Sequence, residues 1–326
     1  MSALLAREQD LRPAGPGHAP TGRSGKTSQR SPLDRQRRKL FVPFVMPALL
    51  FYVVLFVVPI LAAAWISLHN WAGAGEMEWV GLRNYARLVR NDLFLQSFLN
   101  TLLILFIVGT TIFVVAFALT LVLRDMAGKR TARNVLFFPH LINALVFGAL
   151  AGFAFNPNGL VNTFLRAIGV SDPPLWLARD NLFGLVMAIL AWASVGYYTT
   201  ILMAGVDRIP EYFFEDAALA GASAFQRLRY VILPLTWDVF AVCAVLWTIT
   251  SVKIFELVWI FGGTTGVGLP PQEIWTSAVY TYIMAFSGQS IPSFGMASAS
   301  AMLALLLVAV LIVLLRRVTR REALEF

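Results

Sequence analysis

The sequence predicts an all-α, polytopic membrane protein with six transmembrane helices. Of its 326 residues, 58% are hydrophobic and only 13% are charged, whereas soluble proteins carry about 25% charged residues. Six apolar segments reach the length of about 20 residues that crosses a bilayer. Because only helices and closed barrels satisfy their backbone hydrogen bonds in lipid, segments of this kind are expected to be helices.

The chain begins with a basic tail, residues 1–40, that is rich in Pro, Gly, Ser and Arg. It has too few apolar residues to form a core, so we expect it to be disordered. The apolar run that follows Lys39 is much longer than the core of a secretory signal peptide and is followed by further apolar segments. We therefore expect that run to remain as an uncleaved membrane anchor.

The expected spans are apolar segments that together form one transmembrane domain, residues 41–318, followed by a C-terminal tail, residues 319–326. They cover residues 41–68, 98–123, 135–155, 182–204, 235–261 and 297–315.

The distribution of positive charge predicts the orientation of these spans. The tail and the loops on its side of the membrane hold twenty Lys and Arg residues, and the loops of the opposite side hold five. Cytoplasmic loops carry such an excess. We therefore expect both termini in the cytoplasm. Basic residues that flank apolar runs are typical of topology and lipid contact, so no nucleic acid is expected as a partner.

Several kinds of chemistry are not expected from this sequence. A single cysteine, Cys243, excludes a disulfide framework, and three scattered histidines show no metal-ligand spacing. The glycine cluster at residues 262–268 lacks the lysine of a phosphate-binding loop. No catalytic arrangement stands out. We expect no enzyme activity, no metal and no cofactor bound by this chain itself.

One polar-flanked segment, residues 209–234, is expected on the cytoplasmic side as helix, glycine turn and helix. Pro210 suits the first position of a helix, and Gly221 suits its end. Ser223 and Gln226 have the spacing of a capping box that starts a second helix. Pro234 closes the segment.

The first of these two helices has features of a docking surface. Glu215 and Asp216 make it acidic, whereas helices that lie on a bilayer usually carry Lys and Arg. We therefore favour docking to a cytoplasmic protein over a helix that rests on the membrane. Small residues would allow close approach, and phenylalanines would fill a groove. The small residues are Ala217, Ala218 and Gly221, and the phenylalanines are Phe213, Phe214 and Phe225.

Two charged residues fall within the fifth expected span. Lys253 and Glu256 are three residues apart and would share one helical face. Charges in membrane helices usually face a bundle interior, a cavity or each other. They indicate either the polar lining of a solute path or a self-satisfying pair near the outer headgroups, and the sequence leaves both open.

Other polar and aromatic residues within the spans are candidates for the same path, because rings stack on sugars while amides and hydroxyls exchange hydrogen bonds with them. Hydrogen bonds between helices would explain these residues equally well. The candidates are Asn100, Asn143, Tyr197 and Tyr198.

The cytoplasmic segment resembles a known motif. Glu215-Asp-Ala217, three residues, Gly221, nine residues and Val231-Ile-Leu-Pro234 are similar to the EAA loop of binding-protein-dependent ABC-transporter permeases, and depart from it at Asp216 and Val231. The similarity extends over about residues 41–318. Five further stretches resemble the carbohydrate-importer subfamily of these permeases. They cover residues 80–85, 100–102, 156–162, 253–263 and 294–299.

This resemblance implies the type I ABC importer permease architecture, a transport function and a position in a bacterial plasma membrane. Residues 209–234 would couple the chain to a cytoplasmic ATPase dimer, which would bind ATP and Mg. A second homologous permease and an extracytoplasmic substrate-binding protein would complete the importer, and alternating access would move a sugar, such as an oligosaccharide, into the cytoplasm. The alternatives are a permease for a non-sugar solute resembling glycerol phosphate, or an ATP-independent channel or membrane enzyme.

Overall fold

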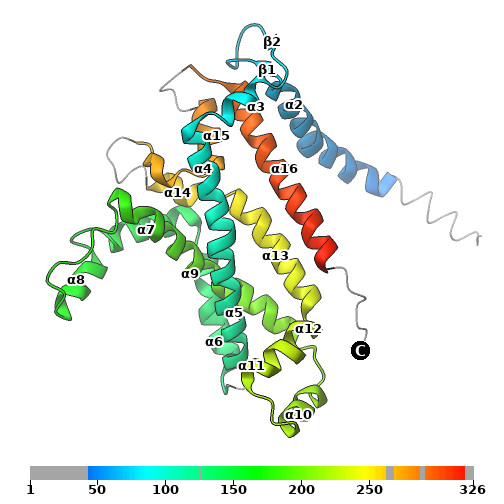
Figure 1. Ribbon diagram of the computed structural model, residues 1–326, viewed down its shortest axis with the longest axis vertical. Coiled ribbons are helices and arrows are strands. Elements are labelled where there is room, and N and C mark those ends of the chain that lie inside the picture. Colours follow the sequence, from blue (N-terminus) through cyan, green and yellow to red (C-terminus); the bar gives the residue numbers. More distant parts are fainter. Residues whose placement is uncertain (1–42, 125, 262–267, 287–290, 320–326) are drawn as a thin grey trace, which may run out of the picture. The chain divides into compact units, whose positions relative to one another are not determined.

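The computed structural model describes residues 43–124, 126–261, 268–286 and 291–319 (Figure 1). The expected N-terminal tail, most of the glycine cluster and the end of the C-terminal tail lie outside these residues. The described residues are mostly helical, with one two-stranded sheet. The prediction of an all-α membrane protein is confirmed.

The chain divides into two compact units. The described part of the first, which ends at Val57, is helical: residues 43–52 are followed by a π turn, η1 (Val53–Val57). The second begins at Val58 and contains the rest of the chain.

Five helices in the described part of the chain are long and apolar enough to cross a membrane. They are Pro43–Ser67, Asp92–Arg124, Arg179–Val206, Trp237–Ile260 and Phe294–Val318.

The expected third span, residues 135–155, is not one straight helix. Helix α6 (Lys129–Leu141) and helix α7 (Ala144–Ala154) meet at an angle of 93°, so a sixth span exists only if this bent pair is counted as one. Extended backbone at Ile142 separates them, and the Asn143 side chain accepts a hydrogen bond from the Leu145 N–H at 2.9 Å. This cap starts a new helix instead of continuing the old one.

The second span is one continuous helical run that starts earlier than the sequence predicts. It comprises α4 (Asp92–Leu103), a π turn η2 (Ile104–Val108) and α5 (Gly109–Arg124). Asn91 caps its start by accepting a hydrogen bond from the Phe94 N–H at 2.8 Å.

The core of the second unit lies where this run packs against α9 (Arg179–Val206) and α13 (Trp237–Val252). Buried side chains at this contact include Val108, Ile112, Leu202 and Cys243. Helix α6 also packs on α9. A Cβ atom at Gly196 of α9 would collide with the Leu136 carbonyl oxygen of α6, so glycine permits this close crossing.

Shorter elements complete the second unit. Strands β1 (His69–Asn70) and β2 (Glu78–Trp79) pair antiparallel, with His69 opposite Trp79. The remaining elements apart from those of residues 209–235 are α2 (Val58–Ser67), α3 (Arg83–Leu88), α8 (Leu160–Ala167), α14 (Glu256–Ile260), η5 (Gln272–Ile274), α15 (Ser277–Phe286) and α16 (Phe294–Thr319).

Candidate functional site

The segment predicted to dock contains a short helix with a defined end. Helix α10 (Tyr212–Leu219) has Glu211 as its N-cap residue, so Pro210 lies before the helix and not at its first position. Gly221 follows the C-cap with φ +71°. Its N–H donates to the Ala218 carbonyl and the Ala222 N–H donates to the Ala217 carbonyl, both at 2.9 Å. This pair of bonds is the Schellman motif, so Gly221 ends the helix as expected.

The second helix of the segment starts with the predicted capping box. The Ser223 N–H donates to the Gln226 side chain at 2.7 Å, and the Gln226 N–H donates to the Ser223 hydroxyl at 3.3 Å. Helix α11 (Ala224–Arg227) continues through a π turn, η3 (Leu228–Ile232), into α12 (Leu233–Leu235). Pro234 therefore lies inside this helical run and does not close it.

Helix α10 and the turn after it form an exposed surface at the opposite end of the second unit from β1 and β2 (Figure 1). Leu219 is 87% exposed and Phe225 is 68% exposed. Leu219 was not among the predicted docking residues, although its apolar side chain lies close to the helix-ending glycine in the sequence. We call this set the docking surface: Glu215, Asp216, Ala218, Leu219, Gly221 and Phe225, all of which are exposed.

Phe214 is not part of this surface, and the prediction that it is an outward anchor is wrong. Its side chain is only 4% exposed and packs with Val206, Ile209 and Ile232. It points inward because these residues and the guanidinium of Arg124 cover its ring. Phe213 and Ala217 are half-buried.

A second candidate site is a cavity of about 500 Å³ between two helix breaks. One break is the bend between α6 and α7. The other lies inside the span Trp237–Ile260, which consists of two helices: α13, whose C-cap is Lys253, and α14, whose first residue is Glu256. The prediction that Lys253 and Glu256 share one helical face is wrong, because the helix stops between them.

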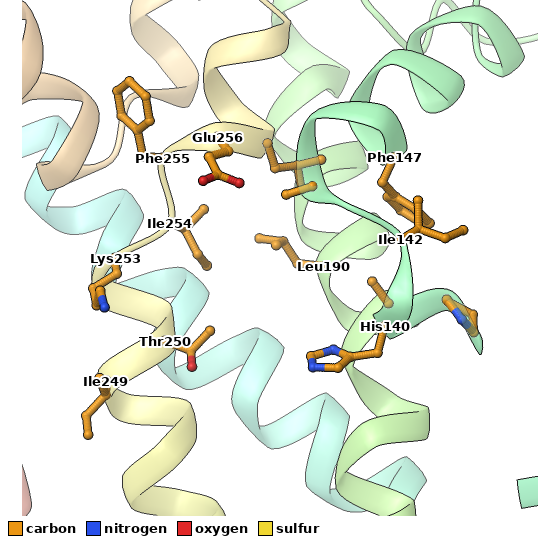
Figure 2. Close-up of a pocket in the computed structure, with 14 residues that line it drawn as sticks. His140, Ile142, Phe147, Leu190, Ile249, Thr250, Lys253, Ile254, Phe255 and Glu256 are labelled. Carbon is orange, nitrogen blue, oxygen red and sulfur yellow. The ribbon is translucent and has the colours of Figure 1, made fainter. Parts of the chain in front are cut away.

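The cavity combines polar and aromatic side chains. The Lys253 and Glu256 side chains are exposed and line it, and no ion pair joins these two described residues. Figure 2 shows that His140 and Glu256 border the same open space. The full lining is Pro139, His140, Ile142, Ala144, Phe147, Leu190, Ala193, Ile249, Thr250, Lys253, Ile254, Phe255, Glu256 and Leu257.

The other residues expected along a solute path have different positions. Tyr197 lies behind the lining, with its ring stacked on His140 at 4.2 Å between centroids. Asn143 uses its side chain to cap α7.

Asn100 and Tyr198 are buried away from the cavity lining. Asn100 donates to the carbonyls of Glu273 and Trp275, at 2.8 and 2.9 Å. Tyr198 packs edge-on against Phe113. Neither residue borders the cavity.

No group of three or more His, Cys, Asp or Glu side chains is placed to hold a metal ion within the residues that the structure describes. The two candidate sites are the exposed surface formed by α10 and the turn after it, and the cavity lined by polar and aromatic side chains.

Comparison with known proteins identifies relatives of this chain along most of its length. No protein-family model matches. The chain is 29% identical over 283 residues to the trehalose/maltose transport system permease protein MalF of Thermococcus litoralis, a match that covers 85% of this chain and 92% of that one. It is 28% identical to the lactose transport system permease protein LacF of Rhizobium radiobacter (87% and 95% covered). It is also 28% identical to the sn-glycerol-3-phosphate transport system permease protein UgpA of Pectobacterium atrosepticum (87% and 96% covered).

A solved structure has the same fold. A chain of a bacterial alginate ABC transporter, crystallised in complex with an alginate pentasaccharide-bound periplasmic protein, matches with a TM-score of 0.72. The match covers 90% of this chain and 98% of that chain, at 17% sequence identity. The chain is therefore a multi-pass membrane protein homologous to the permease subunits of sugar ABC transporters, with the fold of an ABC importer permease.

Proposed function

We propose that this chain is the permease subunit of an ABC importer that moves a sugar, such as an oligosaccharide, into the cytoplasm by alternating access. The observation that carries this proposal is the construction of α10. One face of this helix is fixed to the membrane helices through Phe214, and the other exposes Leu219. Such a helix can bind a partner and move with it as one body.

The partner that fits the docking surface is a separate ATPase subunit, working as a dimer that binds ATP and Mg. Leu219 and Phe225 supply apolar side chains for a groove. Ala218 and Gly221 have little bulk, so the backbone of a partner can approach closely. Nucleotide binding in the partner would favour one position of α10, because a ligand shifts a conformational equilibrium only through different affinity for the two states.

The solute that fits the cavity is a neutral sugar. A volume of about 500 Å³ is in the range of small-molecule sites. Phe147 and Phe255 can stack on the apolar faces of a sugar ring, while Lys253 donates hydrogen bonds to hydroxyl groups and Glu256 accepts them. The relatives named for trehalose/maltose and lactose transport support this class.

An anionic solute is the second candidate, because one relative is named for sn-glycerol-3-phosphate. Lys253 could pair with a phosphate group. However, the Glu256 carboxylate lines the same space and would repel a phosphate. We therefore favour the neutral sugar.

The rest of the importer follows from this assignment. A second, homologous permease subunit would complete the membrane domain. A substrate-binding protein would deliver solute at the side opposite α10, as the complex of the alginate transporter with a periplasmic protein suggests. Both termini of this chain would then lie in the cytoplasm, in agreement with the excess of basic residues on that side.

The test is transport by the reconstituted importer. The chain is co-expressed with its candidate ATPase, second permease and binding protein, and uptake of labelled maltose, lactose and glycerol 3-phosphate into proteoliposomes is measured. We expect ATP-dependent sugar uptake that stops when the ATPase cannot hydrolyse ATP. Uptake that continues with the inactive ATPase would show a channel and refute the importer.

A further inference from the structure

We propose that the helical run Asp92–Arg124, here called the connecting helix, transmits movement of α10 to the cavity, and that Arg124, its last residue, and Asn100, in its first half, are the positioning residues. This inference rests on the proposed function, since it assumes that α10 is moved by an ATPase partner.

At the cytoplasmic end, Arg124 holds α10 through two contacts. Its Nη2 atom lies 2.9 Å from Oε1 of Glu211, the N-cap of α10. Its Cζ atom lies 3.1 Å from the centroid of the Phe214 ring. The arginine side chain is only 14% exposed, and a cation over an aromatic ring is held more strongly when it is shielded from water.

The positions of these groups favour the contact further. Arg124 is the last residue of α5, where the helix dipole is negative, and Glu211 is at the start of α10, where it is positive. Movement of α10 that left the connecting helix behind would break an ion pair and a ring contact together. Arg124 therefore makes the two helices move as one.

The connecting helix is long enough to carry this movement across the bilayer. It has 33 residues, which corresponds to about 50 Å at the rise of an α-helix. At its π turn, the Leu105 carbonyl accepts a hydrogen bond from the Trp247 indole at 2.8 Å. This buried bond fixes the middle of the connecting helix to α13.

At the outer end, Asn100 and Thr101 hold the segment of residues 273–277. The Asn100 amide is 1% exposed and donates to the carbonyls of Glu273 and Trp275. The Ser277 N–H donates to the Thr101 hydroxyl at 2.9 Å. Leaving a buried hydrogen-bonding group without its partner is costly, so this segment must follow the connecting helix.

The last link joins this segment to the cavity. The Thr276 hydroxyl donates to the Ile254 carbonyl at 2.7 Å. Ile254 lies in the helix break between Lys253 and Glu256 and lines the cavity itself. A shift of the connecting helix would therefore displace the break and change how the two charged side chains are presented to a solute.

This route joins the docking surface to the cavity through contacts between segments that are distant in sequence. Spatial continuity alone does not demonstrate coupling, so the inference is tested with matched variants. Arg124→Gln removes the charge at the cytoplasmic end. Arg133→Gln is the control, because the Arg133–Asp207 ion pair has the same 2.9 Å separation but joins α6 to the end of α9.

The first measurement is the amount of sugar transported per ATP hydrolysed by the complete importer in proteoliposomes. We expect Arg124→Gln to lower this ratio about fivefold, in the range of coupling between distant sites, without loss of ATPase binding. Arg133→Gln should keep a ratio close to that of the native protein. Equal ratios in the two variants would overturn the inference.

If Arg124→Gln does not reach the membrane, Phe214→Leu removes the ring below the guanidinium while keeping an apolar side chain, and the same fall in sugar transported per ATP is expected.

The second measurement follows movement directly. Cys243 is the single cysteine of the chain and is buried, so a Cys243→Ser background accepts a label at Thr250→Cys in the cavity or at Tyr230→Cys beside the docking surface. When residue 124 is still arginine, ATP should change the signal of the label at both positions. In Arg124→Gln the response should persist at position 230 and vanish at position 250.

The outcomes separate the two proposals. If position 250 still responds to ATP in Arg124→Gln, the connecting helix is not the route and this inference fails, while the importer assignment stands. If neither position responds in the native background and the ATPase does not bind, the importer assignment fails, and this inference fails with it.

Discussion

The guanidinium of Arg124 lies directly over the ring of Phe214, with 3.1 Å between its Cζ atom and the ring centroid. This contact joins the end of a membrane span to a helix about 90 residues further along the chain. It explains why Phe214 faces inward although it stands in a helix predicted to expose phenylalanines to a partner. The contact also distinguishes the two faces of α10: one packs on the rest of the protein, and the other, with Leu219, is exposed.

Replacing Leu219 should abolish binding of the ATPase. We expect Leu219→Asp to reduce ATPase co-purification at least tenfold, because it puts a carboxylate where a large apolar side chain would be buried by the partner. The control is Leu82→Asp, since Leu82 is also strongly exposed, at 70%, but precedes α3 at the other end of the unit. If both variants bind the ATPase equally well, α10 is not the docking surface.

Gly221 should be needed for the shape of the same surface. Gly221→Asp places a side chain on left-handed backbone at a cost of about 1 kcal/mol and adds bulk and charge where a partner approaches. We expect transport and ATPase coupling to fall while membrane insertion is unchanged. Gly75→Asp is a matched control, because Gly75 has φ +78° and, like Gly221, nothing within 4 Å of an added Cβ. Transport at the native level by Gly221→Asp, with normal ATPase binding, would remove the docking assignment.

The two charges in the cavity should determine solute preference. Glu256→Gln removes a carboxylate that repels anions, so uptake of glycerol 3-phosphate relative to maltose should rise. Lys253→Gln should lower uptake of both solutes, by about tenfold for the loss of a charged hydrogen-bond donor. Both variants should bind the ATPase normally. Unchanged uptake of both solutes in both variants would show that this cavity is not the solute path.

The crossing of α6 and α9 should depend on Gly196. Gly196→Ala adds a Cβ atom that collides with the Leu136 backbone, and such overpacking costs about 1–3 kcal/mol. We expect a lower temperature of thermal unfolding in detergent. Gly184→Ala in the same helix should have no such effect, since nothing lies within 4 Å of its Cβ position. If Gly196→Ala unfolds at the same temperature as the native protein, α6 and α9 can move apart without loss of stability, and the prediction is wrong.

The sequence by itself determined the helical membrane fold, the capping within residues 209–234 and the family resemblance. Each of these depends on residues that are close together in the chain. Long apolar segments require helices, and the backbone at Gly221 and the side chains of Ser223 and Gln226 act on atoms a few residues away. Local chemistry is sufficient for such features.

Only the tertiary structure decided which side chains face a partner, a cavity or the protein interior. The same phenylalanine is an anchor or a core residue depending on whether an arginine from another span covers it, as Arg124 covers Phe214. Asn100 hydrogen-bonds to carbonyls 173 and 175 residues away instead of bordering the cavity. The helix breaks at Asn143 and Lys253 face one cavity because α6 packs on α9 and α7 packs on α14. Contacts between such distant segments leave no periodic pattern in the sequence.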